Sequence, residues 1–149
     1  MIKTIINIDM DKKFSLHKKK SLQRPLFLTP VMAGFPSPAD DFVEKNLDLN
    51  EFLIKNKAAT FFVRVRGDSM KEANILSGDI LIVDRSLEPT DKKIIIAKLF
   101  EEFTVKRLRI KNDKLFLEPQ NPKFQPIEIK EDMDFEVFGV VTYIIHQAK

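Results

Sequence analysis

The stretch that decides the fold is Phe61-Phe62-Val63-Arg64-Val65-Arg66-Gly67-Asp68-Ser69-Met70. Its first six residues are rich in aromatic and β-branched side chains, which favours a strand, and Gly67 ends that strand in a turn. Such a turn exposes the side chain of Ser69 as a candidate nucleophile. It also points successive backbone N–H groups the same way, so those of Asp68 and Ser69 are candidates for binding an oxyanion. The simpler interpretation is ordinary turn chemistry, in which Asp68 or Ser69 caps the residues that follow.

The rest of the chain beyond residue 60 continues the strand pattern. Short linkers separate the predicted strands, and no helical pattern occurs beyond about residue 75. The predicted strands are Ile80 to Asp84, Lys93 to Phe100, Phe103 to Ile110, Lys114 to Glu118 and Phe135 to Ile145. The last of these is apolar on both faces, which is typical of a core strand or of a subunit interface.

Upstream of residue 60 the sequence predicts different local structure. Residues 24–36 contain three prolines and a glycine and should be extended. Ser37 is a suitable N-cap and a proline follows it, so we predict a short helix from there to about Lys45. A second helix is predicted over residues 49–55, with Asp48 near its start. The expected fold is therefore mostly β, with short N-terminal helices and an extended, partly disordered N-terminal arm.

A base for the candidate nucleophile must be a lysine or a carboxylate, because the chain has only two histidines and they lie near opposite ends. In the predicted strand 103–110, alternation places Lys106 on the same face as Leu108 and Ile110, and both arginines on the other. If that face is buried, desolvation lowers the pKa of Lys106 and a neutral amine can accept a proton. The alternative is a surface lysine with a buried stem.

The composition excludes several kinds of protein. The chain has no cysteine, so a disulfide framework, a thiolate zinc site and a cysteine nucleophile are excluded. We expect no cofactor and no metal. No apolar run is long enough to span a membrane, and Lys18-Lys19-Lys20 lies where a signal peptide would need an apolar stretch. We therefore expect a cytoplasmic protein.

Charge is unevenly distributed along the chain. Six lysines and one arginine against two aspartates give residues 1–33 a net charge of +5, whereas residues 34–149 carry −2. A domain with a net negative charge is poorly suited to sequence-independent DNA binding, which depends on many contacts from Lys and Arg to phosphates. The first 33 residues also lack the length and periodicity of a helix-turn-helix unit. Direct sequence-specific DNA binding is therefore not expected.

Several short motifs, in order and at their spacing, resemble the LexA/UmuD-type self-cleaving serine–lysine peptidases. The resemblance extends from about Phe35 to Ile145. The motifs are Phe35 to Glu44, Asp48-Leu49-Asn50, Gly67-Asp68-Ser69-Met70, Gly78-Asp79, Leu81-Ile82-Val83-Asp84, Glu102-Phe103-Thr104-Val105-Lys106 and Val137-Phe138-Gly139-Val140-Val141. The resemblance implies the peptidase β-fold of that family.

The resemblance also implies roles for individual residues. Ser69 would be the nucleophile, Lys106 the general base, and the bond between Ala33 and Gly34 the one that is cut. Residues 1–33 would then be a basic arm removed by self-cleavage, and residues 34–149 the peptidase and polymerase-subunit domain. Two features depart from the family: Ala33 replaces the cysteine better known at that position in UmuD, and the arm is somewhat longer than usual.

The partners that the resemblance implies belong to the SOS response to DNA damage. A RecA filament on single-stranded DNA would stimulate the cleavage, and the product would be a homodimer that joins a UmuC-like Y-family translesion polymerase. One alternative is a LexA-like or phage-type self-cleaving regulator without its own DNA-binding domain. Others are a stand-alone leader-type peptidase and a non-enzymatic adaptor with a vestigial dyad.

Overall fold

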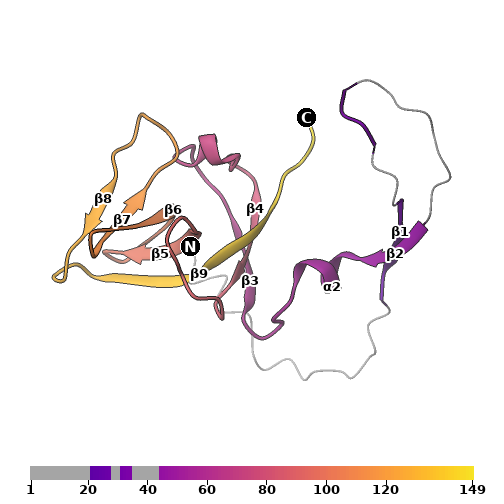
Figure 1. Ribbon diagram of the computed structural model, residues 1–149, viewed down its shortest axis with the longest axis horizontal. Helices are drawn as coiled ribbons and strands as arrows, with labels where there is room; N and C mark the ends of the chain where they lie inside the picture. The colour runs from indigo at the N-terminus through magenta and orange to yellow at the C-terminus, as the bar shows by residue number, and fades with distance from the viewer. Residues whose placement is uncertain (1–20, 28–30, 35–43) are drawn as a thin grey trace. The chain divides into compact units, whose positions relative to one another are not determined.

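The structure is a computed structural model that describes residues 21–27, 31–34 and 44–149. The chain divides into two compact units, Met1–Ile54 and Lys55–Lys149, called here the N-terminal and C-terminal units. Figure 1 shows the elements of each unit along the chain. This boundary lies between two compact units, whereas the predicted division after residue 33 is a bond that is cut. The boundary therefore does not test that division, which stays a prediction.

The N-terminal unit contains a two-stranded antiparallel sheet followed by one turn of helix. Strand β1 (Gln23–Phe27) pairs with β2 (Glu44–Asp48), and α2 (Leu49–Leu53) begins directly after β2. The Asp48 carboxylate caps α2 by accepting hydrogen bonds from the Asn50 N–H at 2.9 Å and the Glu51 N–H at 3.5 Å. The predicted second helix is thus confirmed, although it ends at Leu53.

The predicted first helix needs a correction at its end. Most of it, residues 37–43, lies outside the described residues. Lys45, where it was expected to end, belongs to β2 and pairs with Leu26 of β1. Pairing with β1, which is distant in sequence, takes precedence there over the local helix signal. The extended backbone predicted for residues 24–36 is confirmed over the part that forms β1.

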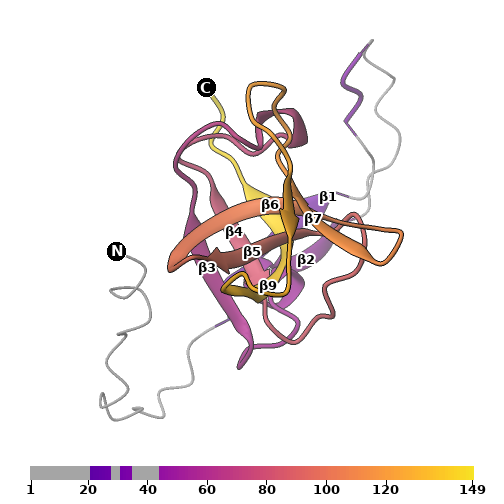
Figure 2. The ribbon, with the colours of Figure 1, turned by 90° about the vertical axis from the view of Figure 1, so that its left-hand side faces the viewer.

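The C-terminal unit is built on one antiparallel sheet of seven strands in the order β3-β4-β9-β5-β6-β7-β8. Figure 2 shows that the sheet is strongly twisted. The strands are β3 (Thr60–Arg64), β4 (Ile80–Asp84), β5 (Ile94–Leu99), β6 (Glu102–Lys111), β7 (Lys114–Glu118), β8 (Ile127–Ile129) and β9 (Phe135–Ile145). A short 3₁₀ helix, η1 (Lys71–Ala73), follows Ser69. The predicted mostly-β class is confirmed, and β8 was missed.

Two clusters of buried side chains form the core of this unit. The first combines the segment around Ser69 with β4 and β5, and contains Val65, Met70, Ile75, Leu81, Val83 and Ile96. The second joins β5 to β6, β7 and β9, and contains Ile95, Ala97, Leu108, Leu117 and Val140. Strand β5 contributes to both because successive side chains point to opposite faces. Met70, which directly follows Ser69, is therefore part of the core, whereas Asp68 before it is exposed.

Strand β9 lies inside the sheet, between β4 and β5, and is irregular at two points. Its pairing with β4 shifts so that Thr142 is left between the partners of Ile82 and Val83, and its pairing with β5 shifts at Phe138. Such bulges bend a strand and increase its twist. Beside the second bulge, a Cβ added to Gly139 would lie 2.6 Å from Val83 Cγ1. Only glycine allows β4 and β9 to approach so closely here.

Candidate active site

Ser69 lies on a loop whose two ends are joined by backbone hydrogen bonds. The Val65 N–H donates to the Asp79 carbonyl at 2.8 Å, and the Gly78 N–H donates to the Val65 carbonyl at 2.9 Å. Gly67 and Gly78 have φ angles of 95° and 98°, which residues with a Cβ rarely adopt. The predicted turn after the first strand is therefore present, although the strand itself ends at Arg64.

The loop is held by side chains on both sides of Ser69. Met70 is 1% exposed and Ile75 is fully buried, so the residues that follow Ser69 are anchored in the core. The Gly67 N–H donates to Ser77 Oγ at 3.2 Å across the loop. Ser69 itself is half-buried. The sequence thus places a hydroxyl on a rigid turn at the protein surface, which is what a positioned nucleophile requires.

Lys106 extends from β6 to the Ser69 side chain. Its Nζ lies 3.0 Å from Ser69 Oγ, 2.8 Å from Thr104 Oγ1 and 3.1 Å from the Val105 carbonyl oxygen. Burial lowers the pKa of Lys106 below its ordinary value, because the charged ammonium is poorly solvated there. The structure therefore brings together the two side chains that the sequence singled out as nucleophile and base.

The face of β6 that carries Lys106 is only partly buried. Leu108 is 1% exposed, as alternation predicted, whereas Ile110 on the same face is 44% exposed. The opposite face also contributes to the core, since Phe103 and Val105 pack against the first cluster. The strand therefore buries apolar side chains on both faces at the end near Lys106.

The three partners of Lys106 match the bonding capacity of a neutral amine. An ammonium has three N–H donors and no acceptor, so in that form Lys106 donates to all three oxygens. After losing one proton it keeps two donors, enough for Thr104 and Val105, and gains a lone pair that can face Ser69. The Ser69 hydroxyl then becomes the donor. This arrangement allows a proton to pass from Ser69 to Lys106 without movement of either side chain.

The peptide groups beside Ser69 are fixed by the segment that follows β7. The Asp68 carbonyl accepts from the Lys71 N–H at 3.1 Å and from Asn121 Nδ2 at 3.0 Å. The Ser69 carbonyl accepts from the Gln120 N–H at 2.8 Å. Among the described residues, no acceptor is found for the N–H groups of Asp68 and Ser69. These two groups remain available to bind a negatively charged oxygen.

Sequence reasoning missed three residues of this site. Thr104 could have been found, because strand alternation puts it on the same face as Lys106, two residues away. Gln120 and Asn121 gave no signal, since they follow a strand in an unremarkable loop and reach Ser69 only through the tertiary fold.

Among the described residues, no group of acidic residues and histidines is arranged to hold a metal ion.

Ala33 and Gly34 belong to the N-terminal unit, whereas Asp68, Ser69 and Lys106 belong to the C-terminal unit. Residues 31–34 are exposed, and nothing lies within 4 Å of a Cβ added to Gly34. A peptide bond in such a stretch is accessible. Its cleavage stays a prediction.

No helix in the described part of the chain is both long and apolar enough to cross a bilayer.

The sequence is similar to those of known proteins over most of its length. The sequence profile of the peptidase S24-like family matches residues 25–142. The chain is 47% identical over 125 residues to protein SamA of Salmonella typhimurium strain LT2, which covers 84% of this chain and 86% of SamA. It is 44% identical over 131 residues to protein ImpA of Escherichia coli, with 87% and 88% covered. It is 34% identical over 139 residues to the LexA repressor of Xylella fastidiosa strain M23, with 93% of this chain but 64% of the repressor covered.

Proposed function

The chain belongs to the peptidase S24-like family of self-cleaving serine peptidases, and we propose that it cuts its own backbone between Ala33 and Gly34 with Ser69 and Lys106. The observation that carries this proposal is the 3.0 Å separation of Lys106 Nζ and Ser69 Oγ, with the pKa of the lysine lowered by burial. Among the described residues, Lys106 is the side chain that bonds to Ser69 Oγ, and a neutral lysine can serve as the base for a serine nucleophile.

The proposed reaction begins with attack on the Ala33 carbonyl carbon. Lys106 accepts the Ser69 proton as Oγ bonds to that carbon, and the carbonyl oxygen becomes an oxyanion. The N–H groups of Asp68 and Ser69 donate to the oxyanion. When the tetrahedral intermediate collapses, the bond from Ala33 to the Gly34 nitrogen breaks, and Lys106 gives its proton to the departing amine.

The second half of the reaction releases the arm. Ala33 is then an ester on Ser69, and a water molecule attacks its carbonyl carbon while Lys106 accepts the water proton. Collapse returns that proton to Ser69 Oγ and frees Ala33 as a carboxylic acid, which loses the second water proton to the solvent. Because the substrate belongs to the same chain, its effective concentration at the dyad is high, so a two-residue site is sufficient.

The cleavage also changes the charge of the protein. The arm of residues 1–33 carries +5, and the product of residues 34–149 carries −2. A product with this charge is better suited to binding proteins than to binding DNA phosphates.

With the family relationship as support, we propose that a RecA filament on single-stranded DNA stimulates the reaction. The product would act as a homodimer in a Y-family translesion polymerase.

A direct test uses the purified full chain. It is incubated at alkaline pH alone, and at neutral pH with RecA, nucleotide and single-stranded DNA, and the fragments are weighed by mass spectrometry. We expect two fragments from the wild type, one that ends at Ala33 and one that begins at Gly34. The Ser69→Ala variant should give neither fragment. Cutting of the Ser69→Ala chain at the same bond would exclude the mechanism.

A second candidate is a self-cleaving regulator, which the 34% identity to a LexA repressor favours. The two functions differ in what the product binds. A polymerase subunit would co-purify with a Y-family polymerase after cleavage and not before. A regulator would lose a partner on cleavage and gain none, so binding assays on the uncut Ser69→Ala chain and on the 34–149 fragment separate the two.

A further inference from the structure

Asn121 is the buried polar residue of the C-terminal unit that contacts the peptide group of Ser69 from a distant segment. The residue is 7% exposed, and its Nδ2 donates to the Asp68 carbonyl at 3.0 Å across 53 residues of sequence. The Lys123 N–H donates to Asn121 Oδ1 at 3.0 Å. That second bond fixes the amide orientation, because the oxygen end is already occupied and the NH₂ end must face Asp68.

The carbonyl that Asn121 binds shares a peptide group with the Ser69 N–H. The chain has no cis peptide bond among its described residues, and in a trans peptide group the C=O and N–H point in opposite directions. A donor that holds the Asp68 oxygen therefore also directs the Ser69 N–H, away from Asn121. Donation to the carbonyl also polarises the peptide group and makes its N–H a stronger donor.

We propose that Asn121 is a positioning residue for the oxyanion hole, one that fixes and strengthens the Ser69 N–H for the proposed self-cleavage. The inference rests on the proposed function of Ser69 and adds a residue to it. Asn121 touches no reacting atom, and acts through the peptide group between Asp68 and Ser69. The neighbouring Gln120 N–H supports the same geometry by donating to the Ser69 carbonyl.

A purely structural role for Asn121 would be to stabilise its own turn. Its Oδ1 and its backbone carbonyl both accept hydrogen bonds within residues 121–124. This role does not account for the donor end of the side chain, which leaves the turn and bonds to the nucleophile loop. The two roles predict different results when that donor alone is removed.

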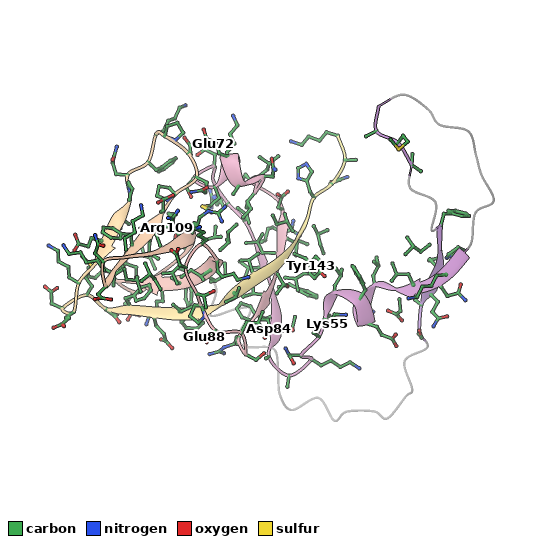
Figure 3. All side chains as sticks on the ribbon, in the orientation of Figure 1. Lys55, Glu72, Asp84, Glu88, Arg109 and Tyr143 are labelled. Atoms are coloured by element: carbon green, nitrogen blue, oxygen red, sulfur yellow. The ribbon has the colours of Figure 1, made fainter. Side chains whose placement is uncertain are left out.

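The test compares three full-length variants with the wild type. Asn121→Ala removes the whole side chain, and Asn121→Asp keeps its shape and the acceptor for Lys123 but removes the donor. Asn56→Ala is the matched control, because it removes an amide that donates to Asp84 at 2.7 Å. Figure 3 shows Asp84 and Glu72, which is three residues from Ser69, at opposite ends of the C-terminal unit.

The first measurement is the self-cleavage rate from pH 7 to 11, with the melting temperature of each variant. Both Asn121 variants should lower the limiting rate at high pH by about tenfold to a hundredfold. This is a smaller loss than the one expected on removing a group that donates directly to the oxyanion. In Asn121→Ala the midpoint of the pH profile should not move, because Lys106 is untouched and no charge is added, whereas the carboxylate of Asn121→Asp should keep the midpoint at or above the wild-type value. Asn56→Ala should cleave at the wild-type rate. A limiting rate within twofold of wild type, or a loss explained by the unfolded fraction, would overturn the proposal.

The second measurement does not depend on cleavage. The ¹⁵N and ¹H shifts of the Ser69 amide are recorded near neutral pH for each protein, and we expect them to move in both Asn121 variants and not in Asn56→Ala. An unmoved Ser69 amide would overturn the positioning role even if the rate fell. If the wild type did not cleave at all, the proposed function would fail, and the amide shift would still decide whether Asn121 fixes this peptide group.

Discussion

Lys106 Nζ lies 3.0 Å from Ser69 Oγ, although 37 residues separate them in the chain. The contact is possible because β6 and the loop after β3 both border the core that surrounds β5. Met70 anchors the serine from one side, and Thr104 binds the lysine from the other. The relative position of the two groups is thus set by the packing of the sheet.

The first prediction concerns the pH dependence of self-cleavage. Only the neutral amine of Lys106 can accept the Ser69 proton, so the rate should rise with pH as the lysine loses its own proton. Because burial lowers the pKa of Lys106, the midpoint of that rise should lie below 10.5, the ordinary value. A rate profile measured by fragment formation checks this. A midpoint at or above the ordinary value would contradict it, and Lys106→Ala should abolish the reaction at every pH.

The second prediction concerns Thr104. Its Oγ1 accepts from Lys106 Nζ at 2.8 Å, and a hydrogen bond stabilises the charged ammonium more than the neutral amine. Thr104→Val keeps the shape and removes this acceptor, so the pKa of Lys106 should fall further and the cleavage profile should move to lower pH. Thr142→Val, which removes a hydroxyl bonded to the Ile82 carbonyl, serves as the control and should leave the profile in place. A shift to higher pH would count against this account.

The third prediction concerns the close approach of β4 and β9. A Cβ at residue 139 would lie 2.6 Å from Val83 Cγ1 and 3.1 Å from the Asp84 carbonyl oxygen, so neighbouring backbone must move. Gly139→Ala should lower the free energy of unfolding by about 1–3 kcal/mol, the usual range for overpacking. The same substitution at Gly34, where nothing lies within 4 Å, should leave it unchanged. Urea unfolding of both variants provides the comparison, and equal stabilities would disprove the argument.

The fourth prediction concerns Asp79, which is 5% exposed. Burial opposes its ionisation, but hydrogen bonds from the Leu76 N–H at 2.8 Å and with His146 Nδ1 at 2.7 Å outweigh that effect and lower the pKa of Asp79 below 3.8. Because the folded pKa is the lower one, the carboxylate stabilises the fold above the unfolded pKa, and this stability is lost as pH falls through the folded pKa.

Asp79→Asn should therefore destabilise the protein most above about pH 5, and its deficit relative to wild type should shrink as the pH falls below the ordinary aspartate range. Free energies of unfolding measured across that range test the sign. Asp132→Asn, at an exposed aspartate, should match the wild type throughout. A deficit for Asp79→Asn that is constant with pH would mean that the charge of Asp79 contributes nothing.

Local patterns were sufficient to predict most of the sheet. Residues 80–84, 114–118 and 135–145 were assigned to strands with the observed bounds, because each combines β-favouring side chains with a turn shortly before it. Alternation along β6 also placed Lys106 on a face with a buried residue, Leu108. These are properties that neighbouring residues determine among themselves.

The features that the sequence did not predict depend on contacts between distant segments. Lys45 was assigned to a helix from its local context, but pairing with β1 makes it part of a strand. Strand β8 has only three residues and is defined by its pairing with β7. Asn121 reaches the Asp68 carbonyl only when the loop after β7 lies against the loop after β3. No pattern within a few residues of Asn121 contains that information.

The order of these parts along the chain has a consequence for biosynthesis. During translation Ser69 leaves the ribosome before Lys106, Asn121 follows later, and β9, which joins β4 to β5, is made after all three. Domains generally fold as units once their sequence is complete. On the proposed mechanism, a chain that still lacks β9 should therefore not cut itself. Loss of the arm would mark only those molecules whose sheet has been completed and correctly folded.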